Sequence, residues 1–516
     1  MLTESPKCTN ENVCEDIGEE QFLLKTPHSR MLGGTEYSWC KALGGGTGIT
    51  VLALHFEQGV DPIQLQEVVH AVQRKYPRLR SKLVRINGNP AFSVCPHPYV
   101  EVEFVESATT SEILSQISSP NGSSPVNDDS STDEISIDSD GYVSDTDCQD
   151  WQYLVEHELN INPWVESPDF QQPKDMLIAK LYHLPQDNSS LFILRIHTSI
   201  CDRASAATIL KEMLHAFYEK KFGHPPPQRA SPSQTEGCDF NEEDLNFMAI
   251  EDAIPKGKAN KPFWAHGIDL LGYSLGSRRH SYLPFEDPQS PRRSQVVRLC
   301  LSSEETTRLQ NACEIEKTTI SGALTAAGLK ATAVLKDLGD QSENYAVTTL
   351  VDCRSLVDNN LPINVVGFYH SAIINTHSIN EAANFWELAR RCSNALETAV
   401  KNRKHFTDIG DVNFLMCQAI QYPSLTPSSS LRTSHIVVFE GPMIDDMGEL
   451  EKAIGLKDYM GCSSIHGVGP SIAVFDTIRN GALDCACVYP APLHSKKQMQ
   501  TLISCMKSIL VSVSKN

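Results

Sequence analysis

A histidine and an aspartate stand close together in residues 196–203, Ile-His-Thr-Ser-Ile-Cys-Asp-Arg. A neutral imidazole, with an unperturbed pKa of about 6.5, can take a proton from a hydroxyl or an amine as that group attacks a thioester. An aspartate nearby can fix the local geometry by pairing with an arginine, without touching substrate. His197 and Asp202 are therefore candidates for acyl-transfer chemistry, although a histidine that ends a strand is more often structural than catalytic.

The residues on either side of this pair predict a strand followed by a helix. Residues 191–196 are apolar and lead into the histidine, and the strongly helical stretch 204–220 follows the aspartate. A strand-to-helix junction is a place where a side chain can face a cleft. The two elements would therefore present the histidine and the aspartate to a ligand.

The chain of 516 residues is too long for one hydrophobic core and suits two domains. Predicted strands and helices mix in both halves, so we expect two α/β (α+β) lobes of similar size. The predicted order is a flexible leader at 1–27, an N-terminal lobe at 28–221, an irregular connection at 222–294 and a C-terminal lobe at 295–516. Within the first lobe, residues 107–150 are poor in apolar residues, which predicts a disordered acidic insert.

The net charge of −20 at pH 7 argues against a nucleic-acid-binding surface. Much of this charge is local, because residues 128–150 hold nine Asp or Glu and no Lys or Arg. Ser130, Ser131 and Ser144 each stand three positions before an acidic residue, a spacing that resembles acid-directed kinase sites. The insert is thus expected to meet a protein partner or a kinase, or else to be a solvated loop without a regulatory role.

Several other classes of protein are excluded by missing motifs. The 16 cysteines include no C-x-x-C pair, which argues against a zinc site and favours reduced thiols. The glycines at 44–48 precede a predicted strand and lack the lysine of a phosphate-binding loop, so they indicate a turn. The metalloprotease motif H-E-x-x-H does not occur. The N-terminus is polar and no apolar run is long enough to cross a membrane, so we expect a cytoplasmic protein.

Several segments together resemble the chloramphenicol-acetyltransferase-like superfamily. Its branches include the condensation domains of nonribosomal peptide synthetases, alcohol and polyketide-associated acyltransferases, and the plant BAHD acyltransferases. The resemblance covers most of residues 28–513. The segments that carry it are 30–36, 76–80 (Tyr-Pro-Arg-Leu-Arg), 197–202, 302–305 (Ser-Ser-Glu-Glu), 351–354 (Val-Asp-Cys-Arg) and 366–370 (Val-Gly-Phe-Tyr-His).

The resemblance implies a pseudo-twofold pair of lobes with a channel between them, which acyl donor and acceptor enter from opposite faces. It implies acyl-CoA or a carrier thioester as co-substrate, no bound cofactor and no metal. Arg354 is the candidate partner of Asp202, with a surface charge as its alternative. Thr198, His370 and Ser434 are candidates for the channel wall. For His370 and Ser434 we favour a plain structural role on their strands.

The family writes H-x-x-x-D-G, often with a second histidine just before, and this chain departs from that pattern. Asp202 lies one position too far from His197, and Arg203 replaces the glycine. In one alignment the loop has gained a residue and His197 is the general base. In the other, His197 matches the first, structural histidine and Thr198 occupies the base position, where threonine cannot act as a base. The second alignment needs no insertion. The BAHD motif D-F-G-W-G is also absent.

Two hypotheses of function follow. In the first, the protein is an acyltransferase of specialised metabolism that moves an acyl group from a thioester to a hydroxyl or amine of a small metabolite. His197 would be its base, and Asp202 with Arg354 would hold the junction. In the second, the protein is a catalytically degenerate relative that binds a metabolite or a protein partner in the same cleft. The direction in which the His197 imidazole points would discriminate between them.

Overall fold

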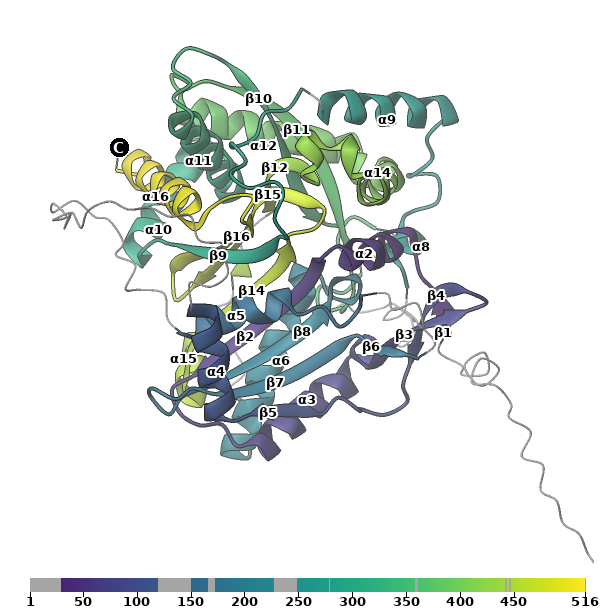
Figure 1. Cartoon of the computed structure of the whole chain (residues 1–516), viewed down its shortest axis with the longest axis vertical. Helices are drawn as coiled ribbons and strands as arrows, with labels where there is room; N and C mark the ends of the chain where they lie inside the picture. Colours follow the sequence, from purple (N-terminus) through teal and green to yellow (C-terminus); the bar gives the residue numbers. More distant parts are fainter. Residues whose placement is uncertain are drawn as a thin grey trace, which may run out of the picture.

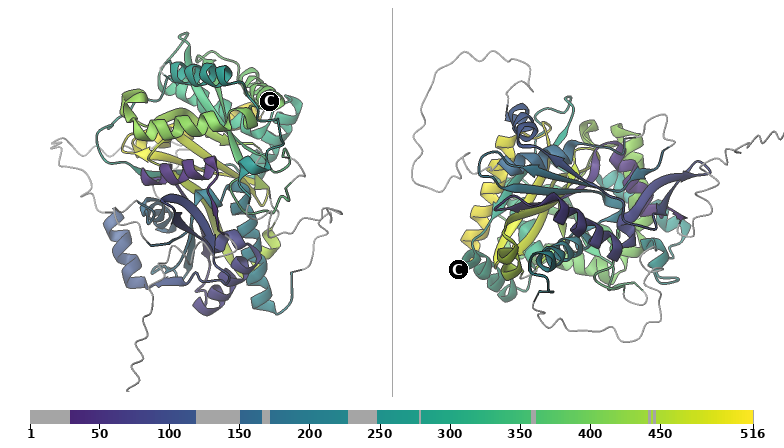
Figure 2. Two further views of the ribbon diagram at one scale, coloured as in Figure 1. Left: turned by 90° about the vertical axis from the view of Figure 1, so that its right-hand side faces the viewer. Right: turned by 90° about the horizontal axis from the view of Figure 1, so that it is seen from below.

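The computed structural model describes residues 29–118, 150–165, 172–226, 248–277, 279–357, 361–440, 443–444 and 447–515. Two lobes lie one above the other in Figure 1, with the first half of the chain below and most of the second half above. Figure 2 shows the same stacking from the side. The predicted leader, residues 119–149 of the acidic insert with Ser130, Ser131 and Ser144, and residues 227–247 of the connection lie outside the described residues.

A five-stranded sheet forms the centre of the first lobe. Its order is β14-β2-β8-β7-β5. The strands are β2 (Thr47–Phe56), β5 (Val102–Val105), β7 (Leu177–His183), β8 (Ser190–His197) and β14 (Leu456–Ile465). On β2 and β8 the side chains alternate between two apolar layers, as a strand requires. One layer packs against α3 (Pro62–Lys75) and α6 (Arg203–Phe222), and the other against α5 (Asp150–Asn160).

The strand β14 comes from the second half of the chain and joins the sheet of the first lobe. It pairs antiparallel with β2 along almost its whole length, from Leu456 opposite Phe56 to Ile465 opposite Thr47. The β14–β2 edge therefore ties the two lobes together by main-chain hydrogen bonds. This crossover was not predicted from the sequence.

A smaller sheet and two helices complete the first lobe. The sheet has the order β1-β4-β3-β6. Its strands are β1 (Ser29–Met31), β3 (Ser81–Ile86), β4 (Asn89–Val94) and β6 (Lys174–Asp175). The helices are α2 (Gly34–Gly44) and α4 (Ser107–Ser118). The prediction of disorder from residue 107 is wrong for its first twelve residues, because α4 packs Ile113 and Leu114 against an apolar cluster.

The second lobe is built on a larger sheet of order β11-β10-β12-β15-β16-β9, with β13 beside β15. Its strands are β9 (Arg293–Cys300), β10 (Glu343–Asp352), β11 (His370–Ile379), β12 (Arg432–Phe439), β13 (Met443–Ile444), β15 (Gly469–Arg479) and β16 (Ala482–Ala491). One face packs against α10 (Ser303–Ile315), α11 (Ile320–Leu335), α12 (Phe385–Lys401) and α16 (Lys496–Val513). A capping box begins α10, with Ser302 and Glu305 bonded to each other's main chain.

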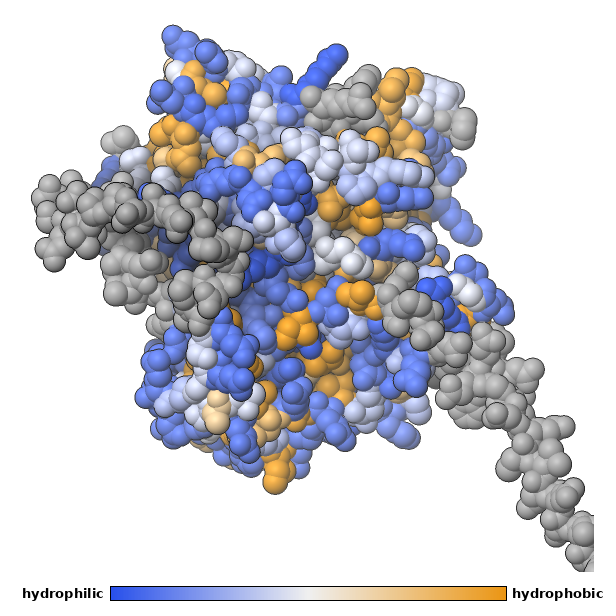
Figure 3. All heavy atoms as spheres, in the orientation of Figure 1, coloured by the Kyte–Doolittle hydropathy of each residue, from blue (hydrophilic) through white to orange (hydrophobic). Residues whose placement is uncertain are grey.

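The remaining helices lie at the edges of the lobes. They are α8 (Ile250–Ala253), α9 (Phe263–Ser277), α13 (Lys404–Thr407), α14 (Ile409–Gln421) and α15 (Gly448–Ile454). Polar side chains hold α9 against the start of α14: Tyr273 of α9 donates to Asp408, the residue before α14, at 2.7 Å. The apolar residues Trp264, Ile268 and Leu271 of α9 are exposed, and the surface over α9 is orange at the upper right of Figure 3. The prediction of an irregular connection at 222–294 is therefore wrong for α9, a helix of fifteen residues.

Candidate active site

A cavity of about 410 Å³ lies between the lobes. The first lobe contributes the end of β2, the β8–α6 junction and β14, and the second lobe contributes β10, β11, β12, β15 and α14. Most of its wall is apolar, with Val437, Phe439 and Phe475 among the lining residues. Such a space, apolar with a few placed polar groups, is typical of small-molecule sites.

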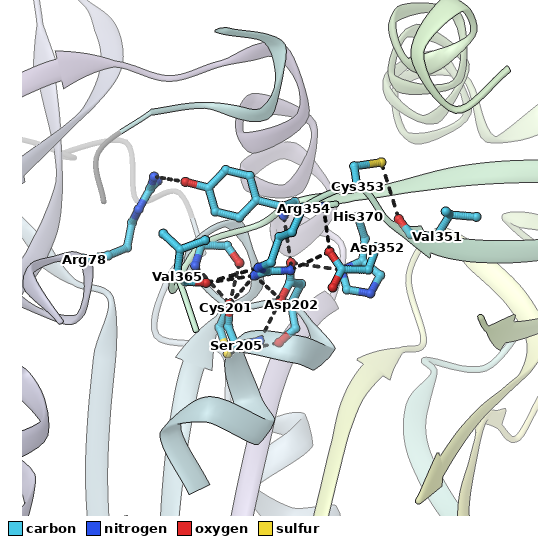
Figure 4. Close-up of polar contacts among 12 residues, drawn as sticks. Arg78, Cys201, Asp202, Ser205, Val351, Asp352, Cys353, Arg354, Val365 and His370 are labelled. Atoms are coloured by element: carbon cyan, nitrogen blue, oxygen red, sulfur yellow. Dashed lines mark hydrogen bonds and ion pairs between the residues drawn. The ribbon is translucent and has the colours of Figure 1, made fainter. Parts of the chain in front are cut away.

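The predicted partnership of Asp202 and Arg354 is confirmed at the edge of this cavity (Figure 4). Asp202 caps α6 by accepting from the Ser205 main-chain N–H at 2.8 Å. Arg354 follows β10 and donates to both carboxylate oxygens of Asp202 at 2.9 Å. Both side chains are almost fully buried, so the surface-charge alternative for Arg354 is wrong. This ion pair joins the first lobe to the second.

Burial and pairing shift the pKa values of Asp202 and Arg354 in opposite directions. Burial alone would raise the pKa of Asp202, but the charge of Arg354 lowers it below its ordinary value. The Asp202 carboxylate in turn holds the pKa of Arg354 above its ordinary value, against the effect of burial. Asp202 is therefore a fixed anion, well suited to positioning and poorly suited to accepting a proton.

A loop of the second lobe is held on the same junction. The Ser205 hydroxyl donates to the Gly367 carbonyl at 2.7 Å and accepts from the Gly367 N–H at 2.9 Å. The Tyr369 main-chain N–H donates to Asp202 at 2.7 Å. These bonds set the direction in which the chain enters β11, and hence the position of His370, the first residue of that strand.

The arginine that replaces the family's glycine has a partner of its own. Arg203 lies 2.9 Å from the Asp476 carboxylate on β15, and its guanidinium stacks over the Phe439 ring at 5.0 Å from the centroid. Both Arg203 and Asp476 line the cavity and are mostly buried. The departure at position 203 therefore adds a second ion pair between the lobes.

His197, the predicted general base, does not line the cavity. It is the last residue of β8 and shares a face with Leu191 and Ile193, so alternation directs its ring toward Trp164, 5.3 Å away between centroids. The ring is fully buried, and Nδ1 accepts from the Ser199 N–H and lies 2.8 Å from the Ser199 hydroxyl. Burial lowers its pKa to about 3. The assignment of His197 as base is wrong on this geometry.

We expect His197 to make stability depend on pH. Because its folded pKa is about 3 and its unfolded pKa about 6.5, the unfolded chain binds the extra proton first. The contribution of His197 is complete above pH 6.5 and falls, by up to about 1.4 kcal/mol per pH unit, as the pH drops toward 3. The free energy of unfolding, measured with denaturant at several pH values in this range, should depend less on pH for His197→Asn. The Oδ1 of this asparagine can replace the Nδ1 acceptor.

The comparison with the variant isolates His197 from other buried histidines whose pKa values are also lowered, such as His435 and His494. Equal pH slopes for wild type and His197→Asn would contradict a neutral, buried imidazole at this position.

Thr198 occupies the position that faces the cavity. Its hydroxyl lies 2.6 Å from that of Thr50 on β2 and 3.3 Å from that of Ser463 on β14. All three residues line the cavity. The geometry agrees with the alignment in which His197 is the structural histidine and Thr198 stands in the base position.

The two other predicted wall residues have different outcomes. His370 lines the cavity and is 5% exposed, and its Nδ1 lies 2.9 Å from Asp202 Oδ2 (Figure 4). Ser434 does not line it, because Ser434 shares the face of β12 that carries Ile436 and Val438 into the core. Its neighbour Thr433 lines the cavity instead. For Ser434 the structural interpretation holds.

Three comparisons place this geometry among known proteins. A family model described as the phthiocerol/phthiodiolone dimycocerosyl transferase C-terminus matches residues 290–409. No curated protein sequence matches significantly. Among solved structures, polyketide synthase associated protein 5 from Mycobacterium tuberculosis is 14% identical, with a TM-score of 0.56 over 94% of this chain and 98% of that one.

Two condensation-type structures are similar to the same extent. The EpoB cyclization-docking bidomain from Sorangium cellulosum has a TM-score of 0.61 at 13% identity, over 96% of this chain and 86% of that one. The first condensation domain of the calcium-dependent antibiotic synthetase has a TM-score of 0.59 at 13% identity, over 95% and 97%. The chain has the two-lobed fold of condensation domains.

Within the condensation fold, residues that the resemblance singled out meet in space. Glu36 on α2 pairs with Arg30 at 2.6 Å and with Arg78 at 2.8 Å. Arg78 also donates to the Tyr369 hydroxyl of the second lobe at 3.3 Å. These contacts hold the small sheet and α2 against the loop that precedes His370.

No sequence signal indicated Thr50 and Ser463 as site residues. Ser463 reaches the cavity only because β14 crosses to the first lobe, which no local signal predicts. Thr50 sits in an apolar strand, where a threonine is ordinary.

Among the described residues, no group of three or more His, Cys, Asp or Glu is arranged to hold a metal ion. No helix in the described ranges is both long and apolar enough to span a bilayer.

Proposed function

We propose that this protein transfers an acyl group from a CoA or carrier thioester to a hydroxyl or amine of a small metabolite. The observation that carries the proposal is the apolar cavity between the lobes, whose wall includes the neighbouring hydroxyls of Thr50, Thr198 and Ser463. Binding both substrates in one such space makes a bimolecular reaction effectively unimolecular. Holding the reactants together in this way can supply much of the reduction in the activation barrier.

The three hydroxyls of Thr50, Thr198 and Ser463 are the groups suited to bind a reacting carbonyl. Together they can direct an O–H toward the oxygen that becomes negative when the thioester is attacked. Donors aimed at a developing charge in a water-poor site contribute strongly to catalysis. Cys201 also lines the cavity, but burial raises the pKa of its thiol well above the ordinary value, so it is no nucleophile near neutral pH.

The apolar wall supports an apolar substrate portion. The matched family is described as a dimycocerosyl transferase, and phenyl rings of Phe368, Phe439 and Phe475 line the cavity here. We therefore include medium and long acyl chains among the donors. The alternative of a catalytically degenerate binding module gains no support from the comparisons, which name a transferase and condensation domains.

The test is an incubation of the purified chain with acetyl-, octanoyl- and palmitoyl-CoA and pooled small alcohols and amines. The expected result is an acceptor whose mass has increased by one acyl group, together with one free thiol for each product. Donors loaded on a pantetheinyl carrier protein form a second arm. Absence of acylated products in both arms would contradict the proposal.

Removing the Thr198 hydroxyl should lower kcat/KM by about 100-fold, the effect of deleting one donor to a developing oxyanion. Thr198→Val keeps the shape of the side chain. Thr348→Val is the matched control, because Thr348 also lines the cavity but lies on β10, in the other lobe. Product formation measured by mass spectrometry should fall for the first variant and stay within about threefold for the second. Equal losses would remove Thr198 from the site.

A further inference from the structure

The reaction proposed above needs a proton acceptor, and the end of β8 does not supply one. His197 is turned away, and threonine cannot serve at position 198. The three aspartates that line the cavity are held by arginines: Asp202 by Arg354, Asp476 by Arg203 and Asp484 by Arg298. Two histidines, His280 and His370, line the cavity in the part of the chain that the structure describes.

Only one of these two imidazoles stands beside a carboxylate. His280 contacts the Thr376 hydroxyl through Nε2 at 3.0 Å and follows α9 at the outer side of the second lobe. His370 instead places its buried Nδ1 at 2.9 Å from Asp202 Oδ2, as an electrostatic contact and not as a hydrogen bond. A negative charge so close to Nδ1 favours the tautomer with the proton on that nitrogen.

With Nδ1 protonated, Nε2 carries the free lone pair. The described residues give it no hydrogen-bond partner, and the ring forms part of the cavity wall between Phe368 and Phe439, whose centroids lie 6.3 and 6.2 Å away. The Asp202 carboxylate is itself fixed by Arg354, Ser205 and the Tyr369 N–H. His370 is thus an oriented imidazole on a rigid support, as a general base requires.

We infer that His370, oriented by Asp202, is the proton acceptor of the acyl transfer, supplied by the second lobe in place of the first. The inference rests on the proposed function. The acceptor oxygen or nitrogen attacks the thioester carbonyl while His370 Nε2 takes its proton. The tetrahedral intermediate then collapses, the C–S bond breaks, and the imidazolium returns the proton to the departing thiolate.

The first experiment compares His370→Gln with His183→Gln in the acyl-CoA assay, because His183 ends β7 and does not line the cavity. Glutamine keeps hydrogen-bonding groups but is not a base. We expect kcat to fall by about 10²–10⁴-fold for His370→Gln, the usual contribution of a general base, and to stay within about threefold for His183→Gln. Retained activity of a folded His370→Gln would overturn the inference while leaving the proposed function standing. Absence of turnover in wild type would overturn both.

The second experiment needs no variant and no turnover. Diethyl pyrocarbonate acylates unprotonated, accessible imidazole nitrogens, and peptide mapping by mass spectrometry locates the modified rings. We expect modification of His370, and slower modification when octanoyl-CoA is present, whereas the fully buried His197 and His435 stay unmodified. An unreactive His370 under conditions that modify His280 would show that its Nε2 is closed off, and the inference would fail.

Discussion

Replacing Arg354 with methionine is expected to lower the free energy of unfolding by about 3–5 kcal/mol. The change removes one partner of a buried ion pair and leaves the Asp202 side chain, which is 1% exposed, without its countercharge. It also releases the Val365 carbonyl, which Arg354 contacts through Nε at 3.2 Å. Because the pair joins the lobes, the loss is expected in the global unfolding transition, measured with chemical denaturant at pH 7.

Arg308→Met is the matched control for this prediction. Arg308 pairs with Glu304 on the surface of α10, four residues away, and such pairs contribute about 0.5 kcal/mol or less. A loss below about 1 kcal/mol for Arg354→Met would mean that the junction is not held by the ion pair.

The same ion pair makes the free energy of unfolding depend on pH in the acid range. The pKa of Asp202 is lowered in the folded protein, so the unfolded chain takes up this proton more readily. The contribution of the pair is present above the unfolded pKa of about 3.9 and is lost as the pH falls below it. Arg354→Met should therefore lose less stability than wild type between pH 4 and pH 2.

Filling the cavity is expected to reduce acyl transfer by at least about 100-fold. Ala372 lies on β11 two residues after His370, and like His370 it lines the cavity. The indole of Ala372→Trp would occupy the space between the substrates and displace their reacting atoms, and a shift of about 1 Å costs about 10²-fold. The assay is product formation from the donor that the acyl-CoA panel identifies, with saturating acceptor.

Ala372→Ser is the control at the same position, and it should keep activity within about threefold. Thermal unfolding of both variants checks the fold, because overpacking of a filled core typically costs 1–3 kcal/mol, whereas here the added side chain enters open space. Full activity of Ala372→Trp would place the chemistry outside this cavity.

Much of the junction could be predicted because its signals are local. The apolar run 191–196 and the helical stretch 204–220 act within a few residues, and they predicted β8 and α6. The partnership of Asp202 with Arg354 joins residues 152 positions apart, and the resemblance alone suggested it.

Other features depend on contacts that no local pattern records. The strand β14 was missed because its partner β2 lies more than 400 residues earlier: Ser464 accepts from the Ile49 N–H across 415 positions. For His197 a signal was present, since alternation along β8 sets it on the face of Leu191 and Ile193. For His370 the decisive neighbour, Asp202, comes from the other lobe, so spacing along the chain said nothing of their contact.

Acyl transfer between the lobes can be tested by a crystal structure of the protein with a ketone analogue of its acyl-CoA donor, in which a methylene replaces the sulfur. We expect the ketone oxygen within hydrogen-bond distance of the Thr198 hydroxyl, with the carbonyl carbon facing His370. An analogue that binds elsewhere, with none of it in the cavity between the lobes, would rule out this site for the reaction.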